Sequence, residues 1–183
     1  MNADIDISKV VIMTERLTLR PWKLTDVEDL YEYASVDGVG QMAGWLPHKN
    51  MGESLDVLKR FIEGKKTFAL EYQGKVIGSL GIEEYHEAEL PEIEYRDRLG
   101  REIGYVLSKD YWGRGLMPEA IQAVVKYLFE NVKLDFIVCG HFIENYQSMR
   151  VQEKCGFEHR KIVKYETRYG IVKNAWLSIL ERK

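Results

Sequence analysis

The sequence predicts a single α/β (α+β mixed) domain, in which a central mixed sheet of six to seven strands is flanked by about four helices. Strand-like and helix-like periods of apolar residues follow one another in the order β-α-α-β-β-β-α-β-α-β-β. A helix pattern at 117–130 separates two strand patterns, so the second of these strands must return parallel to the first. No repeat or linker composition interrupts the 183 residues, and we expect one domain over residues 1–183.

The first third of the chain predicts a strand and two helices. Residues 9–21 alternate apolar and polar side chains, which is typical of a strand. A capping-box pattern at Thr25 and Glu28 predicts a helix that ends near Ser35. Residues 36–51 contain four glycines and prolines and predict a loop. Apolar residues on one face of 53–63 then predict a second helix.

Three strands follow. Residues 67–72 and 76–85 predict a hairpin that turns at Gln73-Gly74-Lys75. An acidic connection from Glu83 to Asp97 leads into a strand at 102–107. That connection would attract a cationic partner, or it is simply a solvated loop.

The second half contains two helices and three more strands. The helix at 117–130 has an apolar face opposite a polar stripe, and a buried strand follows at 135–142. Asn145 is a predicted N-cap and Gly156 a predicted left-handed stop of the next helix. The last two strands, 157–168 and 171–180, turn at Tyr169-Gly170.

Composition excludes several classes of protein. A net charge of −3 argues against a general nucleic-acid binder. No apolar run approaches the ~20 residues of a membrane span, and the acidic start lacks a basic signal-peptide region. We therefore expect a cytoplasmic protein that interacts with neither nucleic acid nor membrane. Cys139 and Cys155 lack C-x-x-C spacing and predict two reduced core thiols, with no metal site.

The segment Y-W-G-R-G-L-M-P-E-A, residues 111–120, has the pattern of a diphosphate cradle. Gly113 and Gly115 let the backbone approach a ligand closely, and the helix that follows offers free N–H groups and a positive dipole end. Pro118 has no N–H to leave unpaired in the first turn, and Arg114 adds a cation for phosphate oxygens. The simpler alternative is a tight turn before a helix. Neither G-x-x-x-x-G-K-[ST] nor G-x-G-x-x-G occurs, so the ligand is not expected to be ATP or NAD.

A second motif gives the first a family context. Some 30 residues after the cradle comes N-Y-Q-S-M-R-V-Q-E-K-C-G-F, residues 145–157, and the chain begins with M-T-E-R-L-T-L-R-P-W at 13–22. Together these motifs resemble the GNAT superfamily of acetyl-coenzyme A-dependent N-acetyltransferases. The resemblance extends over residues 11–180 and is strongest to the branch that contains ribosomal-protein N-terminal alanine acetyltransferases and their uncharacterised bacterial relatives.

The resemblance implies how acetyl-CoA, the acetyl donor, would be held. Free backbone groups of Tyr105, Val106 and Leu107 would bind pantetheine and the acetyl carbonyl, with Val106 or Leu107 as the oxyanion donor. Asn145 would hydrogen-bond pantetheine, and Ser148 would face the same cofactor. The cofactor would also contact the cradle, namely Trp112, Gly113, Arg114, Gly115, Leu116, Met117 and Pro118.

The pattern leaves the catalytic groups open, because many superfamily members have a tyrosine acid where this chain has Gln152. Ser148 is the remaining candidate acid; alternatively, it only positions the cofactor. Glu102 and His141 are the candidate bases, since both sit on strands beside the expected acetyl site.

The predicted function is transfer of an acetyl group to a primary amine, either a protein N-terminus or a small molecule, by direct attack on the thioester. The alternative is a catalytically weak acetyl-CoA sensor or interaction domain. The sequence is compatible with a monomer or a homodimer.

Overall fold

The computed structural model describes residues 1–90 and 92–183, so the acidic connection is described except at residue 91. One sheet has the order β1-β2-β3-β4-β5-β6-β8-β7. Its strands are β1 Ile12–Met13, β2 Leu17–Pro21, β3 Thr67–Tyr72, β4 Lys75–Glu83, β5 Gly100–Leu107, β6 Phe136–Phe142, β7 Glu158–Glu166 and β8 Val172–Glu181. The helices are α1 Val27–Ala34, α2 Met51–Gly64, α3 Leu116–Tyr127 and α4 Tyr146–Lys154.

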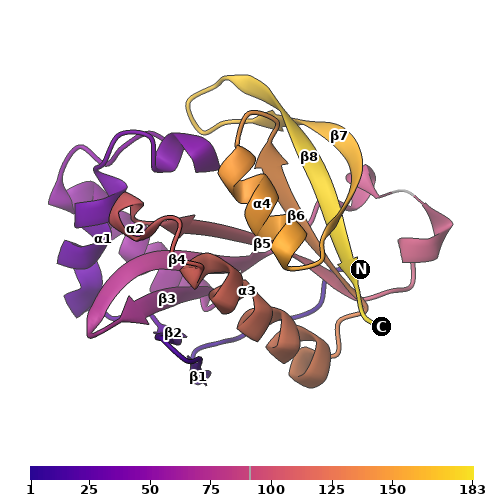
Figure 1. Ribbon diagram of the computed structural model, residues 1–183, viewed down its shortest axis with the longest axis horizontal. Coiled ribbons are helices and arrows are strands. Elements are labelled where there is room, and N and C mark those ends of the chain that lie inside the picture. The colour runs from indigo at the N-terminus through magenta and orange to yellow at the C-terminus, as the bar shows by residue number, and fades with distance from the viewer. Residues whose placement is uncertain (91) are drawn as a thin grey trace.

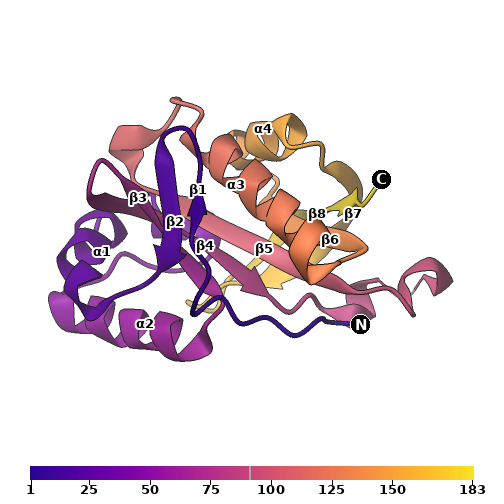
Figure 2. The same ribbon diagram turned by 90° about the horizontal axis from the view of Figure 1, so that it is seen from below.

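The sheet separates two helical layers, as Figures 1 and 2 show. Helices α1 and α2 pack on one face through a cluster that includes Leu30, Leu58 and Trp22. Helices α3 and α4 cover the other face, where Ile121 and Val151 pack against the main core. The predicted mixed α/β architecture is confirmed: β5 and β6 are parallel across the α3 crossover, and the other neighbouring strands are antiparallel.

The sheet has eight strands rather than six to seven, because the strand predicted at 9–21 is two strands. β1 and β2 form an antiparallel hairpin. The Thr14 backbone N–H donates to the Leu17 carbonyl at 2.9 Å, and the Leu17 N–H donates to Thr14 Oγ1 at 2.9 Å. These two bonds close a turn that an alternating pattern alone does not reveal.

The capping box predicted at Thr25 and Glu28 is wrong. Asp26 provides the box instead, since its carboxylate accepts from the Lys23 backbone N–H at 2.7 Å. Arg20 on β2 also binds Asp26 through both terminal nitrogens, each at 2.9 Å. The box therefore caps the 3-10 turn Leu24–Asp26 that leads into α1, and its Asp26 carboxylate is held by a contact with the neighbouring strand.

β5 and β6 pair over only part of their length. The parallel register joins Gly100–Ile103 to Phe136–Cys139, whereas β5 continues to Leu107 and β6 to Phe142. Beyond Ile103 and Cys139 the strands separate, and the end of β5 keeps a ladder partner only in β4. Alternate backbone groups on the open edge of β5 are thus available to a ligand.

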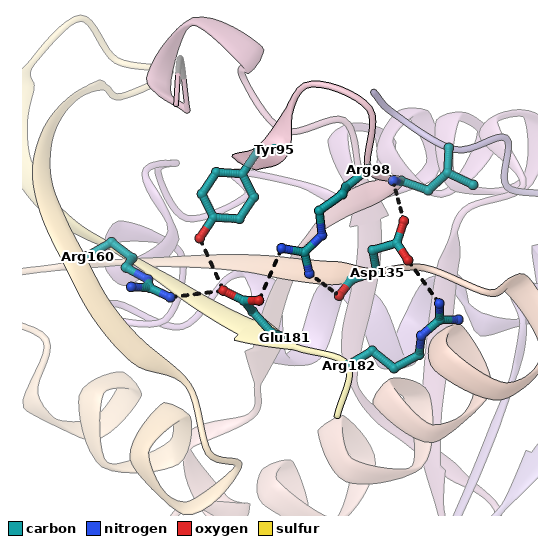
Figure 3. A network of polar contacts seen from close by, with 7 residues as sticks. Tyr95, Arg98, Asp135, Arg160, Glu181 and Arg182 are labelled. Carbon is teal, nitrogen blue, oxygen red and sulfur yellow. Dashed lines mark hydrogen bonds and ion pairs between the residues drawn. The ribbon is translucent and has the colours of Figure 1, made fainter. Parts of the chain in front are cut away.

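β5 and β6 thus form a wedge that is closed where Gly100–Ile103 pairs with Phe136–Cys139. A polar network, drawn in Figure 3, holds this closed end together. Arg98 donates to a Glu181 carboxylate oxygen and to the Asp135 carbonyl, both at 3.1 Å. Asp135 accepts from the Leu99 N–H at 2.8 Å, and Glu181 pairs with Arg160 at 3.0 Å. The network joins the start of β5, the start of β6 and the end of β8, so the two parallel strands can open at one end only.

Candidate functional site

A pocket of about 1050 Å³ lies in the opening between β5 and β6. It is lined from β5 by residues 102–107, from the glycine turn and α3 by 111–113 and 115–118, from β6 by 140–142, and from α4 by 147, 148, 150, 151 and 154. Residues 86, 88 and 89 and parts of β7 and β8 complete its other side. The sequence motifs 111–120 and 145–157 therefore border one cavity.

The cradle predicted at Gly113 and Gly115 has the backbone of an anion site. Both glycines have φ +75°, in the left-handed region that favours glycine, and α3 begins immediately after Gly115. Among the residues that the structure describes, no atom lies within 4 Å of a Cβ built on Gly113, and only Arg16 Nη2 approaches one on Gly115, at 3.6 Å. The space above the turn is open to a ligand, which fits a phosphate at the helix start.

Arg16 contacts both the glycine turn and the start of α3, which the sequence pattern did not predict. Its guanidinium pairs with Glu119 in the first turn of α3 at 2.7 Å and donates to the Arg114 carbonyl at 2.9 Å. Thr14 also donates to Glu119, at 2.6 Å. The acidic side chain in the helix start is thereby neutralised from the β1–β2 turn. The Arg114 side chain is exposed, with its guanidinium 5.1 Å from the centre of the Tyr111 ring.

Two other predicted cofactor residues shape the pocket through backbone contacts. Trp112 Nε1 donates to the Leu107 carbonyl at 2.8 Å, which ties the glycine turn to the end of β5. Asn145 is the predicted N-cap of α4, since its side-chain oxygen accepts from the Ser148 N–H at 3.1 Å. Both residues also line the pocket, and their roles toward a cofactor stay predictions.

The α4 side of the pocket contains a pair of hydroxyl groups. Ser148 Oγ lies 2.7 Å from the Tyr105 hydroxyl, although the sequence pattern assigned Tyr105 only a backbone role. Burial raises the pKa of the Tyr105 phenol well above its usual value, so this group stays protonated. The missed signal was alternation along β5, which puts residue 105 on the face that α4 covers.

Glu102 lies on the opposite face of the sheet. Its strand partners are Glu83 on β4 and Val138 on β6, and Val138 belongs to the apolar cluster on that face. A Cβ on Gly140 would lie 3.7 Å from Glu102 Oε1, so glycine leaves room beside the carboxylate. Burial, together with the charges of Glu89 and Glu83, raises the pKa of Glu102 from 4.5 to about 7. A carboxyl group with this pKa can accept a proton near neutral pH.

His141 lies on the α4 side with Ser148, away from Glu102. Its Nδ1 is 3.1 Å from Gln152 Oε1, and within the described residues its buried Nε2 has no hydrogen-bond partner. Burial lowers the pKa of His141, so the ring is neutral at pH 7. Of the three candidate catalytic residues, the fold places Ser148 and His141 on one face of the sheet and Glu102 on the other.

Comparison with known proteins identifies the family. The model of the Acetyltransferase (GNAT) domain family matches residues 16–158. The chain belongs to the GNAT acetyltransferase family. An uncharacterized N-acetyltransferase, p20, from Bacillus licheniformis is 26% identical over 182 residues, covering 94% of this chain and 97% of that protein.

Two solved structures share the fold. A putative ribosomal-protein-serine acetyltransferase from Vibrio cholerae has a TM-score of 0.77 at 18% identity, with 96% of this chain and 99% of that chain covered. The microcin C7 self-immunity acetyltransferase MccE, in complex with acetyl-CoA and AMP, has a TM-score of 0.75 at 18% identity and coverages of 92% and 93%. The family resemblance drawn from the motifs is confirmed.

As a member of this family, the protein is an acyltransferase. GNAT acetyltransferases use acetyl-CoA as the acetyl donor. Within the described residues, no helix is long and apolar enough to cross a membrane. The same part of the chain contains no group of three or more His, Cys, Asp and Glu side chains suited to a metal ion. Cys139 is buried and Cys155 half-buried, and both are free thiols.

Proposed function

We propose that this acetyltransferase moves the acetyl group of acetyl-CoA to a primary amine, either a protein N-terminus or a small molecule, by direct attack on the thioester. The observation that supports it most is one pocket bordered by a glycine anion turn, an open strand edge and a carboxyl group whose pKa is about 7. An N-terminal amine or a small amine can deprotonate and attack at accessible pH, and a carboxylate of this kind helps it to do so.

The open edge of β5 holds the acetyl-bearing end of the donor. The backbone N–H groups of Gly115, Leu116 and Met117 at the start of α3 would bind the diphosphate, and Asn145 would bind pantetheine. The Val106 or Leu107 N–H would donate to the carbonyl oxygen as negative charge develops there. Acetyl-CoA supplies the activated acyl group; the protein orients it and excludes water.

In the proposed reaction, the amine loses its proton on one face of the sheet and the sulfur leaves on the other. A C–N bond forms and the C–S bond breaks, so the amine loses a proton and the sulfur gains one or leaves as thiolate. Glu102 accepts the amine proton on its face. Ser148, on the α4 face, hydrogen-bonds the departing sulfur. His141 remains the alternative base, although it lies on the α4 side with Ser148.

The acceptor side of the pocket favours a cationic amine. Glu89 and Glu102 both line it. Two other carboxylates of the acidic connection pair with cations, Glu83 with Lys66 and Glu84 with Arg101. The carboxylates of Glu89 and Glu102 would attract a protonated amine to this side of the pocket.

Thiol release from acetyl-CoA tests the proposed function. We expect release in the presence of amines, over a panel that includes polyamines and short peptides with free N-termini, and none with the same peptides N-acetylated. Thermal shifts with acetyl-CoA, ATP and NAD run alongside, and only acetyl-CoA should stabilise the fold clearly. Binding without turnover of any amine would support the sensor alternative, and equal responses to all three ligands would refute the donor assignment.

A further inference from the structure

A chain of buried polar groups runs behind the α4 side of the pocket. Gln152 on α4 has no exposed surface, and its amide nitrogen lies 3.1 Å from the Gly140 carbonyl and 3.5 Å from Ser148 Oγ. Its amide oxygen is 3.1 Å from His141 Nδ1. At the other end, Tyr105 reaches Ser148 Oγ at 2.7 Å. Buried polar groups are costly unless paired, and these hydrogen bonds supply the partners that the buried Gln152 amide needs.

The directions of the hydrogen bonds that Gln152 makes follow from one fixed group. The Gly140 carbonyl can only accept, so the Gln152 amide must present its NH₂ there and its oxygen to His141. That oxygen can only accept as well, and His141 Nδ1 must therefore carry a proton. The histidine keeps the Gln152 amide from turning over.

The same logic applies to Ser148. With its NH₂ fixed, Gln152 can only donate to Ser148 Oγ, through a long bond of 3.5 Å. The Tyr105 phenol, which burial keeps protonated, has one proton and lies closer to Ser148 Oγ than to the Ser148 carbonyl, at 2.7 Å against 3.3 Å. When Tyr105 also donates to Oγ, both lone pairs of Ser148 are used, and its own O–H proton is left to point into the pocket that it lines.

We propose that Tyr105 and Gln152 are positioning residues that donate to Ser148 Oγ and thereby direct the Ser148 hydroxyl proton toward the departing sulfur. The inference rests on the proposed function. It requires no net proton from Tyr105: the serine O–H hydrogen-bonds the thiolate, and the amine proton leaves by way of Glu102. Gln152 stands where many superfamily members have a tyrosine, and the Tyr105 hydroxyl supplies a phenol from β5 instead.

The test measures binding of coenzyme A and of its analogue lacking the thiol, desulfo-coenzyme A, at pH 6 to 9. The ratio of the two affinities isolates the sulfur. A donor aimed at sulfur stabilises the thiolate, so the wild-type ratio should rise with pH through the thiol pKa, near ~8.5. Tyr105→Phe, which removes only the hydroxyl, should lower the ratio at pH 9 by about tenfold, the scale of one hydrogen bond to a charged group. Gln152→Met should lower it less, because its bond is longer.

The double variant separates positioning from packing. In the Ser148→Ala background, Tyr105→Phe should change neither the affinity ratio nor kcat further, because both residues act through one hydroxyl. Tyr127→Phe, on α3 and outside the pocket lining, is the matched control and should leave the ratio unchanged. An unchanged affinity ratio in Tyr105→Phe, or additive losses in the double variant, would overturn this inference and leave the proposed function standing. Failure of the wild type to bind coenzyme A overturns both it and the proposed function.

Discussion

At the residue scale, Glu102 carries the sharpest expectation for catalysis. Glu102→Gln keeps the shape of the side chain and removes the proposed base, so kcat/KM near pH 7 should fall by about 10²-fold or more. The wild-type profile should rise through a pKa of about 7, and that limb should vanish in the variant, which leaves the titration of the acceptor amine. Initial rates from pH 5.5 to 9.5 measure both. A wild-type rate in the variant would make Glu102 structural.

The raised pKa of Glu102 also makes the stability of the fold depend on pH. The folded state raises the pKa of Glu102 from 4.5 to about 7, so its contribution to stability is complete below pH 4.5 and is lost as pH rises through 7. The loss is at most on the order of 3 kcal/mol, since one pKa unit corresponds to about 1.4 kcal/mol. Glu102→Gln should therefore raise the free energy of unfolding at pH 8.5 relative to wild type, with little difference at pH 5. Denaturant titrations at the two pH values check this; equal differences at both would contradict the raised pKa.

A substitution of Ser148 tests whether its hydroxyl helps the coenzyme A sulfur to leave. Ser148→Ala should lower kcat by about 10²-fold with little change in acetyl-CoA affinity, because the hydrogen bond to sulfur strengthens only as negative charge develops there. Steady-state kinetics and calorimetric binding give the two quantities. If affinity falls and kcat does not, Ser148 positions the cofactor rather than helping the thiolate to leave.

At the scale of elements, the glycine turn before α3 is the proposed binding site for the diphosphate of the cofactor. Gly115→Val combines the strain of a β-branched residue at φ +75° with a side chain in the open space where we propose that phosphate binds. We expect a rise of at least tenfold in the KM for acetyl-CoA. Gly170→Val is the matched control, because Gly170 has φ +80° in the β7–β8 turn, away from the pocket.

Both valine variants should lose about 1–2 kcal/mol of stability from the positive φ, but only Gly115→Val should affect the cofactor. Normal acetyl-CoA affinity in Gly115→Val, measured on folded protein, would place the diphosphate elsewhere.

At the scale of the whole molecule, the network around Arg98 closes one end of the β5–β6 wedge (Figure 3). Arg98→Met should lower the free energy of unfolding by about 1–2 kcal/mol, because it removes hydrogen bonds from three strand ends together. Arg160→Met, which removes one exposed ion pair with the same Glu181, should cost about 0.5 kcal/mol or less. Urea unfolding compares them, and equal losses would show that the network does not act as a unit.

The sequence by itself determined the family, the order of the elements and the place of the glycine turn before α3. Each depends on a local pattern: apolar period, glycine spacing or a capping residue such as Asn145, which holds in the structure. Where the apolar and capping patterns failed, hydrogen bonds between residues only three to six positions apart had decided the local structure. Arg20 on β2 holds Asp26 and moves the capping box, and the Thr14 turn divides the first strand.

Only the tertiary structure decided which groups meet in the pocket and on which face of the sheet. Tyr105 and Ser148 are 43 residues apart in the chain, and their 2.7 Å contact exists because α4 packs over the open end of β5. The raised pKa of Glu102 likewise depends first on its burial and then on the charges of Glu89 and Glu83, which the acidic connection and the hairpin bring beside it. Desolvation and Coulomb interactions act through space, and a sequence pattern records only separation along the chain.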